Sequence, residues 1–350
     1  MKIENQSRND TYILMPAYKP DHLMIELLKK LKSEDFDVVI VNDGSGEQFN
    51  DIFEEAKQYA LVLNQDMNRG KGAALRFGFS YINLNPQGHN YVITCDCDGQ
   101  HAVNDIVRVD DKLRETNNVV FGCRKFDKSV PKRSRAGNFM SRLCRTLITK
   151  DYIGDDQCGL RGFPIKMLYN LVPIPGNHYE YEMGVVCNLQ MKKMKIEELP
   201  IETIYIDNNS SSHFSPRLDT FRIQRTIWLN AIGPLVSVLL SMALLLVLTV
   251  LLPKWNVYWL FWISYYAYFQ ITVAILAFVW PTKAIGRRIF IDGIYATIKT
   301  VLIGGLFALF YSVCHFYPLL AYTLAILLVF LCNFPLALLA WKIKMRRNKK

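Results

Sequence analysis

The stretch Tyr91-Val-Ile-Thr-Cys-Asp96-Cys-Asp98-Gly-Gln100-His101 decides the fold class of this chain. It opens with a continuous apolar run, which is typical of a strand buried on both faces of a parallel sheet. Two carboxylates follow, and strand periodicity would point Asp96 and Asp98 to the same side. Asp-x-Asp is also common in turns that only end a strand, so the motif alone leaves both interpretations open.

Two acidic side chains at a strand's carboxyl end suit a hard divalent cation. Mg²⁺ and Mn²⁺ prefer oxygen ligands and are often shared with the phosphate oxygens of a substrate. Ligands of open α/β sheets bind at this edge. The interpretation of Asp96 and Asp98 as a metal site therefore depends on the sequence around them.

Strands and helices alternate around this stretch. We expect further strands over residues 12–18, 38–45, 61–64 and 119–124, and helices over residues 23–32, 51–59 and 104–115. This alternation favours a doubly wound, mostly parallel sheet. The G-x-G-x-x-G fingerprint is absent, which argues against a nicotinamide enzyme. Nucleotide binding is still expected, because Asp43 stands at the end of a strand.

A second candidate for ligand binding is Asn68-Arg-Gly-Lys71-Gly-Ala-Ala-Leu-Arg76. Its glycine-flanked Lys71 enters a predicted helix, where free backbone N–H groups and the helix dipole favour anions. The spacing differs from the Walker A pattern G-x-x-x-x-G-K-[ST]. We expect Lys71 to contact phosphate.

Composition divides the chain into two parts. It has 350 residues and a formal net charge of +10, which fits nucleic acid, an acidic substrate or a membrane surface. Up to about residue 220 it is typical of a soluble domain, and Leu, Val, Phe, Trp and Tyr dominate thereafter. The 8 cysteines form no C-x-x-C pair, so no zinc or redox motif is indicated and a reducing compartment is expected.

The second part predicts a membrane domain. Residues 215–228 mix arginines with large apolar side chains, as in a helix lying at a membrane interface. Four apolar stretches follow, long enough to span a bilayer. They cover residues 229–252, 256–280, 294–316 and 319–341.

Charge predicts the orientation of these spans. Basic residues gather between spans two and three and after span four: Lys283, Arg287, Arg288, Lys342, Lys344, Arg346, Arg347, Lys349 and Lys350. By the positive-inside rule both ends are cytoplasmic. Residues 1–10 lack the apolar core of a signal peptide, which agrees with a cytoplasmic first domain. Much of the positive charge then serves to orient the spans in the membrane, so it does not indicate nucleic-acid binding.

A series of ordered motifs carries a family resemblance. They are Met15-Pro-Ala-Tyr18 with Asn42-Asp-Gly-Ser45, the Asn68–Arg76 segment, Asp96-Cys-Asp98-Gly-Gln100, Gly122-Cys-Arg124, and Asp155-Asp-Gln-Cys-Gly-Leu-Arg161. This series resembles family 2 glycosyltransferases, specifically the dolichyl- or polyprenyl-phosphate sugar synthases. The membrane part resembles the GtrA-like segment fused to some of these synthases.

The resemblance implies a GT-A fold, an α/β doubly wound, mostly parallel sheet, followed by an all-α four-helix transmembrane domain. The implied domains are a cytoplasmic GT-A domain (1–214), an interfacial helix (215–228), four transmembrane helices (229–341) and a basic cytoplasmic tail (342–350).

The resemblance also implies roles for individual residues. Those that would bind the nucleotide sugar are Pro16, Ala17, Tyr18, Asp43, Lys71 and Asp96. Those that would hold Mg²⁺ or Mn²⁺ against the donor diphosphate are Asp96, Asp98 and Gln100. Those that would bind the acceptor phosphate are Arg124, Arg133, Ser134 and Arg135, although such basic clusters are usually solvated helix starts.

Asp98 and Asp155 are the expected catalytic residues. A polyprenyl phosphate is already ionised, so Asp155 would position it and would take a proton only from a hydroxyl acceptor. Glu180 and Glu182 are weaker candidates, for which a polar rim beside the core is the simpler account.

Together these observations predict a metal-dependent transferase. It would move one sugar from a UDP- or GDP-sugar to undecaprenyl or dolichyl phosphate, with inversion by direct displacement, at a bacterial plasma membrane. One alternative is a processive polysaccharide synthase, whose Q-x-x-R-W segment Gln224-Arg-Thr-Ile-Trp228 does not match. The other is a non-catalytic transporter of lipid-linked sugars, against which the intact Asp43, Asp96 and Asp98 count. Homo-oligomerisation is left open.

Overall fold

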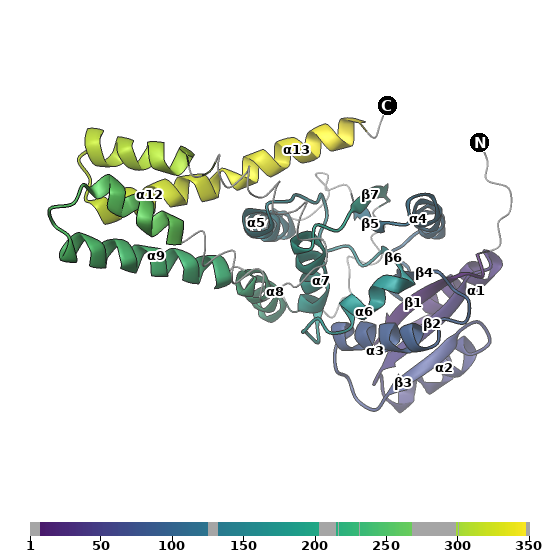
Figure 1. Ribbon diagram of the computed structural model, residues 1–350. Coiled ribbons are helices and arrows are strands. Elements are labelled where there is room, and N and C mark those ends of the chain that lie inside the picture. The colour runs from purple at the N-terminus through teal and green to yellow at the C-terminus, as the bar shows by residue number, and fades with distance from the viewer. Residues whose placement is uncertain are drawn as a thin grey trace. The chain divides into compact units, whose positions relative to one another are not determined.

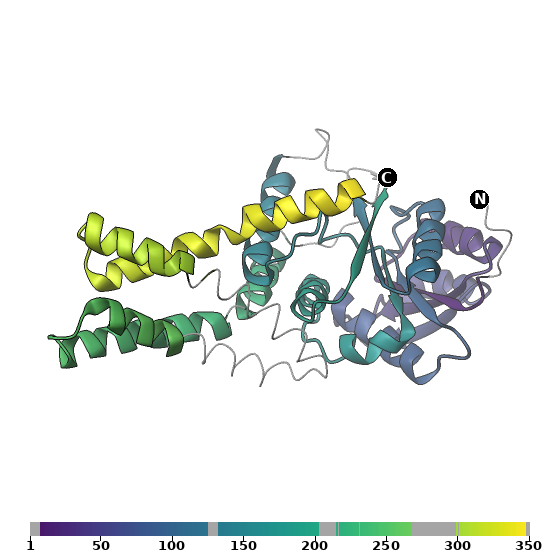
Figure 2. The ribbon, with the colours of Figure 1, turned by 45° about the horizontal axis from the view of Figure 1, so that its top comes forward.

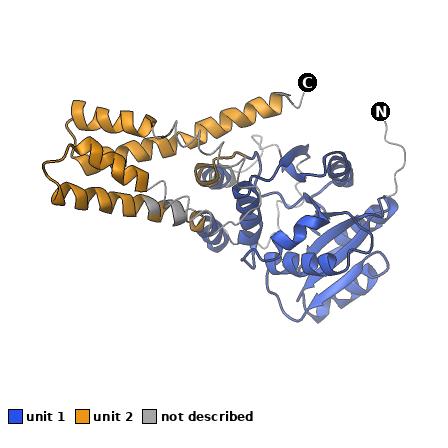
Figure 3. Cartoon of the chain, viewed as in Figure 1, with its two compact units in different colours: residues 1–142, 153–227 blue, residues 143–152, 228–350 orange. Residues whose placement is uncertain are grey.

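The computed structural model describes residues 8–124, 132–202, 215, 217–230, 232–267, 299 and 301–347. The chain divides into two compact units, coloured separately in Figure 3. Unit 1 comprises Met1–Arg142 and Ile153–Ile227, and unit 2 comprises Leu143–Tyr152 and Trp228–Lys350.

Unit 1 is built on a 7-stranded sheet of order β3-β2-β1-β4-β6-β5-β7 (Figure 1). Its strands are β1 (Thr11–Ala17), β2 (Asp37–Asp43), β3 (Leu61–Gln65), β4 (Tyr91–Thr94), β5 (Val119–Arg124), β6 (Arg161–Pro164) and β7 (Ile196–Ile201). β1 pairs in parallel with β2 and β4, whereas β6 runs antiparallel between β4 and β5. The predicted mostly parallel α/β sheet is confirmed.

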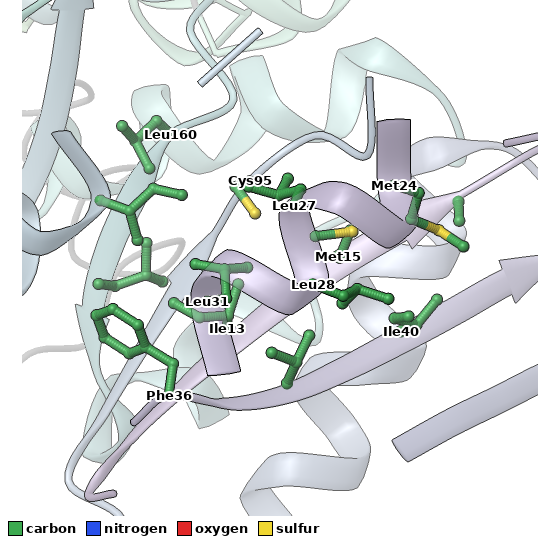
Figure 4. Close-up of a cluster of buried hydrophobic side chains, with 14 of the residues drawn as sticks. Ile13, Met15, Met24, Leu27, Leu28, Leu31, Phe36, Ile40, Cys95 and Leu160 are labelled. Carbon is green, nitrogen blue, oxygen red and sulfur yellow. The ribbon is translucent and has the colours of Figure 1, made fainter. Parts of the chain in front are cut away.

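Helices cover both faces of this sheet. Those of the first half are α1 (His22–Ser33), α2 (Asn50–Ala56), α3 (Lys71–Leu84) and α4 (Val103–Thr116). In Figure 4, Ile13 and Met15 of β1 lie against Leu28 and Leu31 of α1 in a core that also contains residues of α2 and α4. α3 packs on the opposite face.

A glycine allows α3 to approach the sheet closely. A Cβ added at Gly78 would come within 2.2 Å of Leu14 Cδ1, on the face of β1 opposite to Ile13. A side chain at position 78 would therefore push α3 away from β1, and the glycine lets the middle of this helix lie close to the sheet.

The second half of unit 1 adds α5 (Lys132–Thr149, shared with unit 2), α6 (Leu168–Leu171), α7 (Tyr179–Met191) and α8 (Leu218–Leu229). α7 is seen nearly end-on in Figure 2. The sequence had not predicted β6, β7 or α7.

One sequence prediction needs correction. β4 ends at Thr94, and the chain then turns through Gly99, whose φ is +73°. Asp96 and Asp98 therefore lie in a turn beyond the strand, and the argument from strand periodicity does not apply to them. A one-residue spacer places two side chains on one side only while the backbone stays extended.

Unit 2 contains α9 (Ile232–Leu251), helical residues 257–267 and 301–308, a π-helical turn at Leu309–Val313, α12 (Pro318–Leu331) and α13 (Asn333–Arg347). Its core is rich in aromatic side chains, with the rings of Phe261 and Phe307 stacked at 4.2 Å. Within it, Tyr322 Oη donates to Ser241 Oγ over 3.0 Å.

Among the described residues, one helical stretch is long and apolar enough to cross a membrane, Pro318–Arg346. Val238–Leu251 and Val301–Val313 are shorter apolar helices. Parts of predicted spans two and three, and the basic loop between them, lie outside the described residues. The four-span domain thus remains a prediction.

Candidate active site

The first part of the site lies where β1 and β2 end. These strands are neighbours, with Ala17 opposite Asn42, so the residues predicted to bind the nucleoside, Pro16 to Tyr18 and Asp43, reach one edge of the sheet. Burial raises the pKa of the Asp43 carboxyl, although two backbone N–H groups oppose this effect.

Asp43 also fixes the next loop. Its Oδ1 accepts from the Arg69 N–H and its Oδ2 from the Gly70 N–H, both over 2.8 Å. A carboxylate between two backbone donors orients the segment that carries Lys71. Binding of a base by Asp43 stays a prediction.

The start of α3 is docked on the residues just before α7. The Ala73 N–H donates to Asn177 O over 3.0 Å, and Arg76 donates to the Asn177 side chain over 2.6 Å. Gly70, at φ +96°, leaves no room for a Cβ, which would lie 2.4 Å from both Asn177 O and His178 Nδ1. A glycine at position 70 is thus required by packing as well as by backbone conformation.

Lys71 lies between two carboxylates. Its Nζ is 2.7 Å from Asp96 Oδ1 and 3.1 Å from Glu182 Oε2, and it lies over the ring of Tyr179. Burial alone would lower the pKa of Lys71, but the two carboxylates outweigh it and raise that pKa, so the side chain stays an ammonium. It provides a fixed positive charge at the carboxyl end of β4.

The pKa values of Asp96 and Asp98 are shifted in opposite directions. Burial would raise the pKa of Asp96, but Lys71 and His101 outweigh it and lower that pKa. His101 Nε2 is 3.6 Å from Asp96 Oδ2. The pKa of Asp98 is raised by burial and by the charge of Asp96, while its Oδ1 accepts from the Gln100 N–H over 3.0 Å.

These residues fit a divalent cation. Asp96 already binds a positive group, the Lys71 ammonium. Asp98 lies close enough to Asp96 for the negative charge of Asp96 to raise the Asp98 pKa. No group of three or more His, Cys, Asp and Glu side chains suited to a metal occurs in the described part of the chain. Two carboxylates and the amide of Gln100 would leave coordination positions for phosphate oxygens, as Mg²⁺ sites in phosphoryl-binding enzymes do.

A second charged pair follows β5. Arg124 Nε and Nη2 donate to Asp155 Oδ2 and Oδ1 over 2.7 and 3.2 Å. Burial would raise the pKa of Asp155, but the Arg124 guanidinium outweighs it and lowers that pKa. Asp155 is thus held as a carboxylate, while 30% of the Arg124 side chain is exposed.

The loop that carries Asp155 passes directly over Asp96. A Cβ added at Gly159 would lie 2.7 Å from Asp96 Oδ2, and Thr94 Oγ1 donates to Gly159 O over 2.7 Å. Only a glycine allows this approach. Residues that are more than fifty positions apart in the sequence are thereby brought to one place.

The basic cluster predicted to bind the acceptor is only partly described. Arg133, Ser134 and Arg135 lie in the first turn of α5, but their side chains are outside the described part of the structure. Their role as acceptor-phosphate ligands stays a prediction.

Comparison with known proteins identifies the family. The model of glycosyl transferase family 2 matches residues 12–168. An uncharacterised protein of Methanocaldococcus jannaschii is 30% identical over 55% of this chain and 88% of its own length. The chain belongs to glycosyl transferase family 2.

Two further relatives have named activities. A UDP-N-acetylglucosamine–dolichyl-phosphate N-acetylglucosaminyltransferase of Methanococcus voltae is 27% identical over 56% of this chain and 86% of its own length. An undecaprenyl-phosphate 4-deoxy-4-formamido-L-arabinose transferase of an Enterobacter species is 26% identical over 43% of this chain and 47% of its own length.

Sequence reasoning undervalued one residue in this family 2 transferase. Glu182 had the simpler interpretation of a polar rim, but the structure puts its carboxylate on Lys71. Glu180 instead caps α7, accepting from the Asn177 and His178 N–H groups. Two acids in the first turn of a helix look alike in sequence, and only their partners distinguish them.

Proposed function

We propose that this family 2 glycosyltransferase moves a single sugar from a nucleotide sugar to a polyprenyl phosphate. The observation that carries the proposal is the meeting of two charged pairs. Lys71–Asp96 lies on the side of the predicted nucleotide site. In the second pair, Arg124 at the end of β5 contacts Asp155, whose loop crosses Asp96 at Gly159. A transferase with two anionic substrates needs such cations on both sides of the reacting centre.

On the donor side, Asp96, Asp98 and Gln100 would hold Mg²⁺ or Mn²⁺. The cation would offset the charge that develops on the leaving nucleoside diphosphate. Lys71, which contacts Asp96 and Glu182, adds a second positive charge beside the diphosphate. Pro16, Ala17, Tyr18 and Asp43 would hold the nucleoside at the ends of β1 and β2.

On the acceptor side, Arg124 and the basic residues of α5 would hold the lipid phosphate. The guanidinium of Arg124 donates to Asp155 through Nε and Nη2, and 30% of the Arg124 side chain is exposed. Because Asp155 is held as a carboxylate, it can orient the Arg124 fork. The phosphate acceptor is itself ionised and requires no strong base.

The named relatives support a lipid-phosphate acceptor. Both carry dolichyl or undecaprenyl phosphate in their names, and the apolar Pro318–Arg346 helix fits a chain that works at a membrane. The domain limits proposed from the sequence, with catalysis in residues 1–214 and four spans in residues 229–341, belong to this proposal.

The test is transfer by the purified full-length protein. It is incubated with radiolabelled UDP- and GDP-sugars and with undecaprenyl or dolichyl phosphate in the presence of Mg²⁺ or Mn²⁺. We expect one nucleotide sugar to give a solvent-extractable lipid that carries one sugar. A growing polymer would favour a processive synthase instead, and absence of transfer from every donor would contradict the proposal.

A further inference from the structure

The Lys71 ammonium has two acidic partners of different kinds. Asp96 belongs to the turn proposed to hold the cation, whereas Glu182 belongs to α7 and has no place in that ligand set. Both contacts are short, 2.7 Å to Asp96 and 3.1 Å to Glu182, and the Glu182 side chain is 13% exposed. An ammonium at Asp96 Oδ1 occupies an oxygen that a metal ion also needs.

Glu182 is a fixed partner. Its backbone O accepts from Arg161 Nη1 over 2.8 Å, and Arg161 also donates to Asp156 O and Cys158 O. Arg161 is 3% exposed, so this tie between α7 and the Asp155 loop is buried. The backbone of Glu182 is therefore anchored, and only its side chain can adjust if Lys71 moves.

The docking of α7 on the first turn of α3 also restrains the backbone on the Lys71 side. Gly72 leaves no room for a Cβ, which would lie 2.5 Å from Tyr181 Cβ and 2.6 Å from His178 O. The backbone that carries Lys71 and the helix that carries Glu182 thus keep a constant separation. What can change is which carboxylate the Lys71 ammonium contacts more closely.

We propose that Glu182 is a positioning residue that keeps the Lys71 ammonium when a divalent cation takes the Asp96 carboxylate, so that Lys71 stays beside the donor diphosphate. The inference deepens the proposed function and rests on its metal site. Without the Glu182 charge, Lys71 would have Asp96 as its remaining carboxylate partner and would compete with the cation for it.

Binding of Mn²⁺ alone, without sugar donor or lipid, tests this competition. Titration of the full-length protein, followed by electron paramagnetic resonance of free Mn²⁺, gives the dissociation constant. We expect Glu182→Gln to raise this dissociation constant about three- to tenfold, which lies in the lower part of the range of coupling between groups in contact. Lys71→Met should lower it, because the competing ammonium is gone.

The decisive measurement is the double variant. On the Lys71→Met background, Glu182→Gln should change the Mn²⁺ dissociation constant by less than twofold, since no ammonium remains to be held. An equal effect in both backgrounds would mean that Glu182 acts through its negative charge alone and would overturn the proposal. No effect in either background would overturn it as well.

Glu180→Gln is the matched control. It removes the same charge from the same helical turn, but the Glu180 carboxylate contacts backbone N–H groups of residues 177 and 178. We expect a change of less than twofold in Mn²⁺ affinity, and an effect equal to that of Glu182→Gln would overturn the specific role of Glu182.

If the wild-type protein bound no Mn²⁺, the metal site of the proposed function would be refuted together with this inference. If it bound Mn²⁺ and Glu182→Gln bound equally well, the inference alone would fall.

Discussion

At the residue scale, Asp96 and Asp98 are the side chains on which the proposed chemistry depends most. Asp98→Asn and Asp96→Asn each remove a carboxylate ligand while keeping the shape of the side chain. We expect each to lower transfer by about a hundredfold or more, because the leaving diphosphate loses its counter-charge. Transfer and thermal unfolding are measured on the same preparations, and the melting temperature should change little. Full activity of both variants in EDTA would refute the metal assignment.

Arg124 has a structural role that the sequence did not indicate. Asp155 is buried, with 1% of its side chain exposed, and Arg124 is its cation. Removing one partner of a buried pair leaves a charge without compensation, so Arg124→Ala should reduce the free energy of unfolding by about 3 kcal/mol at neutral pH. Chemical denaturation with urea measures this loss.

The loss of unfolding free energy in Arg124→Ala should depend on pH. The folded-state pKa of Asp155 lies below its ordinary value of 3.8, so the pair stabilises the fold fully above pH 3.8. As the pH falls through the lowered folded-state pKa, Asp155 takes up a proton and the stabilisation is lost. The difference in stability between wild type and Arg124→Ala should therefore narrow below pH 3.8. A difference that stayed constant down to acid unfolding would contradict the ion pair.

Arg133→Ala separates lipid binding from stability. Arg133 is proposed to contact only the acceptor phosphate, a charge-assisted contact worth about 1.5–3 kcal/mol. Its loss should raise the KM for lipid about ten- to a hundredfold and leave the KM for nucleotide sugar unchanged. Lysine should rescue only in part because it lacks the guanidinium fork. A raised KM for the nucleotide sugar alone would assign the basic cluster to the donor.

At the scale of elements, the packing of α3 on α7 fixes the donor side of the site. Gly70→Ala would force a Cβ into Asn177 O and His178 at a φ of +96°. Gly88 is the matched control, since its φ is +86° and nothing lies within 4 Å of an added Cβ.

We expect Gly88→Ala to cost about 1–2 kcal/mol of unfolding free energy from backbone strain alone. Gly70→Ala should cost at least about 1 kcal/mol more, because strain and overpacking add. It should also raise the KM for nucleotide sugar, since Lys71 follows it directly. Equal losses in urea denaturation and an unchanged KM would show that the docking of α3 on α7 is unimportant for the site.

At the scale of the whole molecule, the prediction concerns orientation in the membrane. The excess of lysine and arginine in residues 281–293 and 342–350 predicts that both termini are cytoplasmic. A cytoplasmic reporter fused after Lys350 should be active, and one inserted after Lys254 should not. Activity of the Lys350 fusion only outside the cytoplasm would refute the four-span arrangement.

The sequence by itself determined the parallel core of unit 1. Strands β1 to β5 and helices α1 to α4 were predicted from apolar runs and helical periodicity, which are local signals. β6 was not predicted because Arg-Gly-Phe-Pro is short and has no alternation of apolar and polar residues. It forms a strand because β4 and β5 pair with it on either side.

Motif order in the sequence also determined the family and gave the candidate site residues, including Asp43, Lys71 and Asp96. Only the tertiary structure decided their partners. The pairs Arg124–Asp155 and Lys71–Glu182 join residues separated by 31 and 111 positions, and both depend on loops brought together where Gly159 and Gly70 leave room. The reason is physical: side-chain type and local pattern follow from sequence, whereas which charge neutralises which depends on packing between distant segments.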